Sequence, residues 1–241
     1  MTKKKVLCIV SNLRTNNGVA SCMMNYLPFT AGEEFQIDFL CLDDTESDYI
    51  TYLKENGISY FVLPHGSDKK DSVNKKYVAD VIAQGKYDAV HVNIVYYWAF
   101  YALRCAKKSN IKCRILHAHN PRLMNSISNK RRTFLFTGLC NLYSTDYLAC
   151  TEAAGKSVFG SRNFTVIHNA IDAQKYLFDF QAREKYRKQY NLEGKFVLGT
   201  SCRHTEQKNP FFLVDIFEAL HKNKPETVLL WVGLGLSLIH I

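Results

Sequence analysis

Proline and glycine are both scarce in this sequence, with 5 and 12 residues among 241. Their scarcity excludes collagen-like and linker-like compositions. Apolar residues are not lacking, since 47% of the chain is hydrophobic and 22% is charged, so low hydrophobicity cannot make it disordered. The 14 tyrosines and 15 phenylalanines predict a sizeable core. At about 100–200 residues per domain, the length allows one large domain, or one complete domain and part of a second.

The 8 cysteines lack metal-binding spacing, because no two are separated as C-x-x-C. We expect free, mostly buried thiols, no disulfide framework and no metal site.

Long apolar runs are also missing: the longest uncharged segment, Thr227 to Ile241, is shorter than the roughly 20 residues of a membrane-spanning helix. The apolar stretch after Lys3–Lys5 ends at Val10, short of the roughly 7–15 residues of a signal-peptide core. The chain is therefore predicted to be cytoplasmic.

Basic residues outnumber acidic ones, 31 to 22, for a net charge of +9. This balance favours an anionic partner, which could be nucleic acid, a phosphorylated small molecule or an acidic membrane face. No segment resembles an RNA-binding or helix-turn-helix signature, so we do not assign the charge to nucleic acid.

Predicted strands and helices alternate from the first residue, which indicates an α/β fold with a parallel sheet and helices on both faces. Gly18 follows a strand and precedes a helix. Two further helices are expected, one capped by Ser47 or Asp48 and ended by Gly57, the other capped by Asp71 and ended by Gly85. The predicted strands are 6–11, 35–42, 58–63, 87–94, 112–117, 147–150 and 164–168, and the predicted helices include 96–108 and about 129–144.

Residues 172–194 are charged and poor in core residues, and we interpret them as a connector after a first domain at 1–171. A second alternation follows at 195–235: strand 195–201, helix 210–221 and strand 227–232. One such unit can hardly bury its own sheet, so the second domain is expected to be incomplete.

Residues 236–241, L-S-L-I-H-I, resemble a translated transposon-end adapter. We expect a cloning or assembly scar there, with a genuine hydrophobic tail as the alternative.

Two glycine motifs could bind phosphate. A-G-K-S, which includes Lys156, is expected to follow a strand and open a helix, but Cys150 stands where a P-loop needs its first glycine. An ordinary helix start is the alternative. The pair Gly233 and Gly235 follows a strand, yet the third glycine of a dinucleotide fingerprint falls at Leu238.

His117 and His119 stand two apart at the end of a predicted strand. Side chains with this spacing point to one face, so both imidazoles can reach one pocket at the carboxyl edge of the sheet, where such folds bind ligands. Histidines that donate to loop carbonyls are the alternative. A metal site would need a third ligand, and none stands at helpful spacing.

Two basic clusters are candidate anion sites. Arg203 and Lys208 lie between a strand and a helix start, as a bound diphosphate would require, and a solvated loop is the alternative. Lys130, Arg131 and Arg132 precede an apolar helical stretch that could dock on an acidic lipid surface or an anionic acceptor, unless they are the exposed end of a core helix.

Five segments together resemble the family 4 glycosyltransferases of the GT-B fold, particularly those that build bacterial capsular or exopolysaccharide. They are K-K-V-L-C-I-V-S-N-L-R-T-N-N-G-V-A-S-C-M-M-N-Y, H-A-H-N, A-C-T-E-A-A-G-K-S-V-F-G, F-T-V-I-H-N-A-I-D and R-H-T-E-Q-K-N-P-F-F-L-V-D-I-F. They occur in the same order as in that family and span nearly the whole chain.

The resemblance implies two Rossmann-like domains, the first for the acceptor and the second for a UDP- or GDP-sugar, without another cofactor. It implies that Arg203 and Lys208 bind the diphosphate together with the loop of Gly18. It places His119, and less firmly His117, beside the transferred sugar, and it makes Asn169 and Asp172 hinge or cleft residues. The family retains anomeric configuration and needs no metal, since cations and N–H donors stabilise the leaving group.

The sequence departs from the family in two places. Asn17 replaces the first of two paired glycines, and because Asn tolerates left-handed geometry the turn is expected to survive. The acidic E-x7-E segment of the donor domain is missing. We therefore expect a retaining glycosyltransferase, truncated and inactive as a fragment, that extends a lipid-linked glycan at the inner face of the plasma membrane. The alternatives are a non-catalytic membrane-associated partner in polysaccharide assembly and a nucleoside-triphosphate enzyme that uses Lys156.

Overall fold

The structure is a computed structural model that describes residues 3–32, 34–43, 46–68, 71–94, 96–120 and 127–233. The chain divides into two compact units, Met1–Asp172 and Ala173–Ile241. The suspected tail at 236–241 lies outside the described residues, as do the side chains of Lys130, Arg131 and Arg132. Each unit is an α/β layer structure, as the alternation of the sequence predicts.

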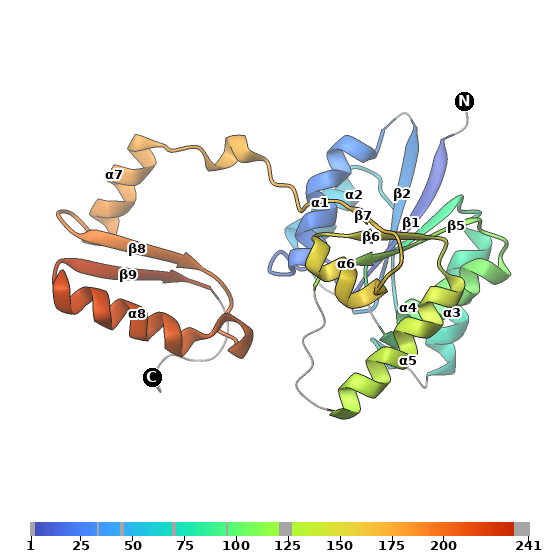
Figure 1. Cartoon of the computed structure of the whole chain (residues 1–241). Helices are drawn as coiled ribbons and strands as arrows, with labels where there is room; N and C mark the ends of the chain where they lie inside the picture. Colours follow the sequence, from blue (N-terminus) through green and yellow to red (C-terminus); the bar gives the residue numbers. More distant parts are fainter. Residues whose placement is uncertain are drawn as a thin grey trace. The chain divides into compact units, whose positions relative to one another are not determined.

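Unit 1 is built on a parallel sheet of seven strands, and its spatial order is β3-β2-β1-β4-β5-β6-β7 (Figure 1). The order reverses between β1 and β4, because the chain first winds outward from β1 to β3 and then returns to the other side of β1. The strands are β1 (Lys4–Val10), β2 (Phe35–Cys41), β3 (Tyr60–Val62), β4 (Ala89–Val92), β5 (Cys113–Ala118), β6 (Asp146–Ala149) and β7 (Thr165–Val166).

Helices connect these strands, and polar side chains cap several of them. Asn17, Ser47, Asp71 and Thr151 each accept a hydrogen bond from a backbone N–H in the first turn of the helix that follows. The helices are α1 (Gly18–Thr30), α2 (Asp48–Glu55), α3 (Ser72–Gln84), α4 (Tyr96–Lys108), α5 (Ile127–Tyr143) and α6 (Glu152–Phe159).

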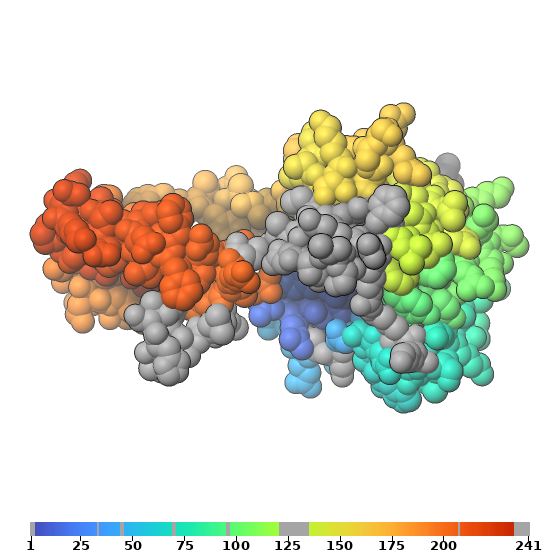
Figure 2. All heavy atoms as spheres, turned by 60° about the horizontal axis from the view of Figure 1, so that its bottom comes forward, coloured from blue at the N-terminus to red at the C-terminus, as the bar shows by residue number. Residues whose placement is uncertain are grey.

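The core has one layer on each face of this sheet, as the alternation of side chains along β1 shows. Leu7 and Ile9 point into a layer with α3, α4, α5 and α6, whereas Cys8 and Val10 point into a layer with α1 and α2. α3 and the described part of α5 form part of the outer surface of unit 1 in Figure 2, in turquoise and yellow-green. Strands that are buried on both faces explain the continuous apolar runs of the sequence.

A charged network in unit 1 surrounds the buried carboxylate of Asp38, in the middle of β2. The carboxylate of Asp38, only 1% exposed, lies 3.1 Å from Nζ of Lys5 and accepts a 2.9 Å hydrogen bond from the hydroxyl of Tyr87. Burial and this carboxylate raise the pKa of Tyr87, so the phenol stays a donor. The two partners satisfy a charge that would otherwise be costly to bury.

Unit 2 contains a parallel pair, β8 (Phe196–Ser201) and β9 (Thr227–Val232), which α8 (Pro210–Asn223) connects. Two 3₁₀ turns, η1 (Ala173–Tyr176) and η2 (Glu206–Lys208), and the helix α7 (Phe180–Gln189) complete its described part. α7 buries no residue, in agreement with its charged sequence. Large apolar side chains such as Phe211, Phe212 and Val232 are more than half exposed.

The prediction of the element order is confirmed, and the differences concern boundaries. β3 and β7 are shorter than predicted, since the strand pairing covers Tyr60–Val62 and Thr165–Val166. All eight cysteines are free and six are buried, as expected. Among the described residues, no helix is long and apolar enough to cross a membrane.

Candidate functional site

The strand order reverses between β1 and β4, which makes the carboxyl edge of the sheet at this point a topological switch point in unit 1. In open α/β sheets such a switch point is where ligands bind, because the loops from the two sides separate there. The loop after β1 leads into α1 on one side of this point. On the other side, β4 and β5 end in His91, Asn93, His117 and His119.

The loop after β1 is held in shape by Asn17. Its amide nitrogen donates to Oγ of Ser11 at 3.1 Å and to Oδ1 of Asn12 at 3.0 Å, and its oxygen accepts from the N–H of Val19 at 3.0 Å. Its φ of −97° and ψ of 109° are extended, so the expected reliance on left-handed geometry is wrong. The turn survives because the Asn17 side chain caps α1.

Gly18, the first residue of α1, has open space beside it. A Cβ at this position would meet nothing within 4 Å, and its φ is not in the left-handed region. Neither packing nor backbone strain therefore explains a glycine here. The space leaves the N-terminus of α1 accessible to a ligand, whose negative charge the helix dipole would favour.

His117 and His119 come together as their spacing predicts. Their ring centroids lie 4.0 Å apart, and His117 is only 4% exposed at the end of β5. Nε2 of His117 and Nδ1 of His119 are buried without a hydrogen-bond partner among the described residues. Buried polar groups in proteins are nearly always partnered, so two adjacent exceptions indicate a place for a ligand.

Sequence reasoning missed two residues of this cluster, His91 and Asn93, which come from β4. Nε2 of His91 lies 3.1 Å from Nδ1 of His117, and Nε2 of His119 lies 2.8 Å from Oδ1 of Asn93. The signal was present in the sequence: H-V-N at the end of one strand has the same two-residue spacing as H-A-H at the end of the next. Only the pairing of β4 with β5 brings the two together.

The three imidazoles are electrically neutral. Burial, together with the neighbouring rings, lowers the pKa of His91 and of His119 to about 3, and burial lowers the pKa of His117 to about 4. Neutral rings can accept as well as donate hydrogen bonds. Among the described residues, no group of three or more His, Cys, Asp or Glu is arranged to hold a metal ion.

The imidazole cluster is linked to α1 through two thiols. The thiol of Cys150, directly after β6, contacts the backbone oxygen of His119 at 3.0 Å. Burial and the nearby Cys150 raise the pKa of Cys22, which lies in the second turn of α1. The helix that begins at Gly18 therefore borders the end of β6 and, through it, the imidazoles.

Asn169 and Asp172 lie in the segment that leaves β7, at the end of unit 1. α1 holds this segment: Nδ2 of Asn25 donates to the carbonyl of Ala170 at 2.8 Å, and the Tyr26 hydroxyl donates to the carbonyl of His168. Asn169 and Asp172 are exposed. Their role as hinge or cleft residues stays a prediction.

Unit 2 places Arg203 and Lys208 in the single loop between β8 and α8. Both residues are exposed, and Asn209 caps α8 directly after them. The loop also contains buried polar atoms without a partner in the described part of the chain: Nε2 of His204, Oγ1 of Thr205 and, beside them, Nε1 of Trp231. Sequence reasoning missed these three residues, because the loss of hydrogen-bond partners on burial has no pattern in the sequence.

The phosphate-loop interpretation of A-G-K-S is wrong. α6 begins at Glu152, so Gly155 lies inside the helix, where its N–H donates to the carbonyl of Thr151. A Cβ on Gly155 would lie 2.2 Å from the ring of Phe164, so close packing explains this glycine. Lys156 forms an exposed ion pair with Glu152 at 3.3 Å. Gly233 likewise has a packing role, because a Cβ there would collide with the carbonyl oxygen of Cys202.

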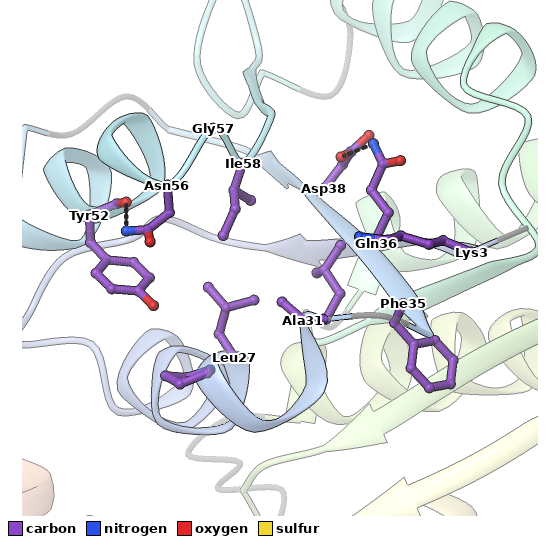
Figure 3. Close-up of a pocket in the computed structure, with 13 residues that line it drawn as sticks. Lys3, Leu27, Ala31, Phe35, Gln36, Asp38, Tyr52, Asn56, Gly57 and Ile58 are labelled. Carbon is purple, nitrogen blue, oxygen red and sulfur yellow. Dashed lines mark hydrogen bonds between the residues drawn. The ribbon is translucent and has the colours of Figure 1, made fainter.

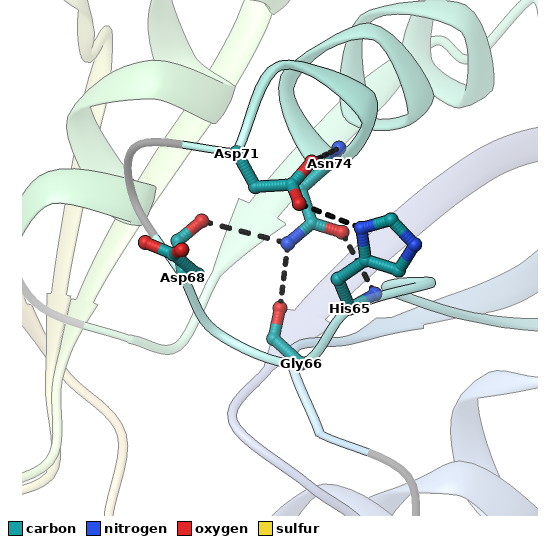
Figure 4. Close-up of polar contacts among 5 residues, drawn as sticks. All are labelled: His65, Gly66, Asp68, Asp71 and Asn74. Carbon is teal, nitrogen blue, oxygen red and sulfur yellow. Dashed lines mark hydrogen bonds and ion pairs between the residues drawn. The ribbon is translucent and has the colours of Figure 1, made fainter.

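Two further features of unit 1 do not belong to the imidazole cluster. Asn74, fully buried, bonds to the loop at His65 and Gly66, while Asp71 caps α3 and lies 2.6 Å from Nδ1 of His65 (Figure 4). These groups fix the loop after β3.

A cavity of about 570 Å³ lies at the amino edge of the sheet, between the ends of α1 and α2, and Leu27 and Ile58 point into it (Figure 3). It is at the opposite edge from the imidazoles.

The seven-stranded parallel sheet with its switch point, followed by a second parallel unit, is a GT-B-type Rossmann-like architecture, as predicted. The chain is similar to Anabaena HepE in complex with UDP and glucose, with a TM-score of 0.76 and 18% identity over 97% of this chain and 62% of that one. The chain is also similar to a glycosyltransferase from Rickettsia africae, with a TM-score of 0.60 and 12% identity over 96% of this chain and 69% of that one. Its similarity to Staphylococcus aureus MnaA with UDP has a TM-score of 0.58 and 18% identity over 95% of this chain and 62% of that one.

The chain spans about 62% of the length of the first of these structures. No protein-family model matches the sequence, and no curated protein does. At these identities the likeness concerns the fold.

Proposed function

We propose that this chain is part of a glycosyltransferase that moves a sugar from a nucleotide-sugar to an acceptor. The observation that carries the proposal is the loop between β8 and α8. Two cations, Arg203 and Lys208, precede a helix N-terminus there, next to buried polar atoms that have no protein partner in the described part of the chain. A diphosphate and the groups attached to it would satisfy both features.

Unit 1 contributes a second group of candidate ligand-binding atoms. Its switch point offers the open N-terminus of α1 at Gly18 and the unpartnered nitrogens of His117 and His119. For the proposed reaction we assign stabilisation of the departing diphosphate to Arg203 and Lys208 of unit 2. Within unit 1 we assign to the α1 N-terminus the binding of an anionic group, and to His119 a hydrogen bond with a hydroxyl of the transferred sugar. The fold supports this, since HepE, which shares it, was solved with UDP and glucose.

We further propose that the transfer retains anomeric configuration. Inverting the sugar needs a base, and a double displacement needs a carboxylate beside the sugar carbon. The described side chains that contact the three imidazoles are one another and the amide of Asn93. The three imidazoles are weak bases, because their pKa values lie at about 3 to 4, so we propose that the leaving phosphate takes the acceptor's proton.

The acceptor is proposed to be a growing, lipid-linked glycan in cell-surface polysaccharide synthesis, as the resemblance to family 4 glycosyltransferases implies. Docking of Lys130, Arg131 and Arg132 on an anionic inner-membrane surface belongs to this proposal. Vesicles with and without anionic lipid test it, by comparing the chain with a variant in which all three residues are Gln. Equal binding of both proteins would remove the membrane from the proposal.

The main test is a binding and turnover experiment with UDP-glucose, GDP-mannose and related nucleotide-sugars, with and without a lipid-linked oligosaccharide. We expect binding of one donor class by the chain and acceptor-dependent release of UDP or GDP from the complete protein. Because UDP-N-acetylglucosamine 2-epimerases share the fold, conversion of the sugar at C2 is monitored by NMR. Epimerisation without transfer would replace the proposal, and failure to bind any nucleotide-sugar would refute it.

A further inference from the structure

The side-chain amide of Asn93 has only one orientation that fits its surroundings. Asn93 follows β4 and is 5% exposed, and its backbone N–H donates to the carbonyl of Ile9 at 2.8 Å. Nδ2 donates to the carbonyl oxygen of His91 at 3.2 Å. The reversed amide would place two oxygens against each other, so Oδ1 is the atom that faces His119.

This orientation determines where His119 carries its proton. Oδ1 of Asn93 can only accept, and it lies 2.8 Å from Nε2 of His119. Nε2 must therefore carry the hydrogen. In a neutral ring the other nitrogen, Nδ1, then has a lone pair and no hydrogen.

The ring of His119 stays neutral because of its surroundings. Burial and the adjacent His117 hold its pKa far below neutrality, at about 3. Nδ1 is thus a pure acceptor at physiological pH. It is buried and has no partner among the described residues, which leaves a hydrogen bond to be made.

His117 differs from His119 in this respect. Its Nδ1 faces Nε2 of His91, and either of those two nitrogens can be the donor. Its unpartnered Nε2 can consequently be a donor or an acceptor. Only His119, through Asn93, has its role at the site fixed by the protein.

We propose that Asn93 is a positioning residue that holds His119 as its Nε2–H tautomer, so that Nδ1 binds only a ligand group that donates a hydrogen bond. The tautomer rests on the contacts of Asn93 and on the neutrality of the buried ring. The identity of the donor, a sugar hydroxyl, rests on the proposed function. A carbonyl or phosphate oxygen at the same place would face a lone pair and be rejected.

The tautomer is measured directly by long-range ¹H–¹⁵N correlation NMR on the whole chain with ¹⁵N-labelled histidine. We expect His119 to show a protonated Nε2 and an unprotonated Nδ1 between pH 6 and 8. A protonated Nδ1, or a mixture of tautomers, would overturn the proposal. This spectrum needs no ligand and no enzymatic activity.

Three variants test the part played by Asn93. Asn93→Leu removes the acceptor and should give a mixture of tautomers at His119. Asn93→Asp keeps an acceptor, so it should keep the tautomer while raising the pKa of His119 by about one unit or more. Asn74→Leu is the matched control, because Asn74 is another fully buried amide but contacts the loop after β3, and His119 should be unchanged. A His119 signal that is unaltered in Asn93→Leu would refute the positioning role.

UDP-glucose and UDP are the probes for the ligand. The Nδ1 resonance of His119 should move when UDP-glucose binds, as its lone pair accepts a hydrogen bond, and should stay in place with UDP. Binding of UDP-glucose without a change at Nδ1 would overturn the hydroxyl assignment. If UDP-glucose does not bind, both the hydroxyl assignment and this donor fail, while the tautomer result stands by itself.

Discussion

The imidazoles of His91 and His117 lie nearly parallel, with an interplanar angle of 11° and ring centroids 5.2 Å apart. They belong to adjacent strands, β4 and β5, and their Nε2 and Nδ1 atoms are 3.1 Å apart. One hydrogen shared between two neutral rings satisfies both nitrogens. A further proton on the accepting nitrogen would place two N–H groups against each other and a positive charge in a poorly solvated place.

The stability of unit 1 should therefore fall when the pH drops below about 6.5. The unfolded chain has histidines with a pKa of about 6.5, whereas the folded values are about 3 for His91 and His119 and about 4 for His117. Between these limits the unfolded state binds more protons, so stability rises with pH and is complete above 6.5. At pH 5 the loss is up to about 2 kcal/mol for each imidazole.

Urea denaturation from pH 4.5 to 8 measures this effect. The slope of unfolding free energy against pH should be smaller in His91→Gln, which removes one of the three titrating rings. A wild-type stability that is flat between pH 5 and 7 would show that the rings are not buried in neutral form.

Gly155→Ala should destabilise the chain by about 1–3 kcal/mol, because its Cβ would overlap the Phe164 ring. The matched control is Gly138→Ala on α5, where a Cβ meets nothing within 4 Å, and which should stabilise by about 0.5–1 kcal/mol. Thermal unfolding distinguishes the two. Loss of nucleotide binding without loss of stability in Gly155→Ala would revive the phosphate-loop interpretation.

Lys5→Met and Lys4→Met should differ strongly, although the two lysines are neighbours on β1. Lys5 pairs with the buried Asp38, whereas Lys4 pairs at 3.3 Å with Asp88, whose side chain is 44% exposed. Removing Lys5 leaves a buried charge without its cation, at a cost of about 3 kcal/mol or more. Removing Lys4 should cost less than about 1 kcal/mol. Equal urea midpoints for the two variants would contradict the buried network.

Arg203→Ala and Lys208→Ala should each weaken binding of UDP-glucose by about 10- to 150-fold, the value of one charge-assisted hydrogen bond. Lys222→Ala is the control, since Lys222 pairs with Glu218 on α8 at 2.8 Å and should not contribute. Calorimetric titration measures all three. An affinity that is unchanged in Arg203→Ala and Lys208→Ala would exclude this loop as the diphosphate site.

Much of the fold could be predicted because its signals are local. Asp71 caps its helix as predicted, and of the two predicted candidates Ser47 and Asp48 the cap is Ser47. Gly57, at a φ of 64°, follows the helix that it was expected to end. The pairing of His117 with His119 could be predicted for the same reason. The backbone of a strand fixes the distance between side chains two residues apart, because both point to the same face.

Contacts between strands could not be predicted in this way. His91 and Asn93 join the cluster only through the register of β4 with β5, and Gly155 is explained only by Phe164, which lies beyond the end of α6. The motif G-K-S is the same in sequence whether its glycine binds phosphate or packs against an aromatic ring. The fold around it decides which.

The sequence by itself determined the α/β alternation, the buried thiols, the basic loop at Arg203 and Lys208 and the nearness of two imidazoles, because each depends on periodicity or on short spacing. The tertiary structure decided the order of the strands, the third imidazole and the amide that orients His119. These depend on which strands lie side by side, and that choice is made by packing over the whole sheet and not by any one segment.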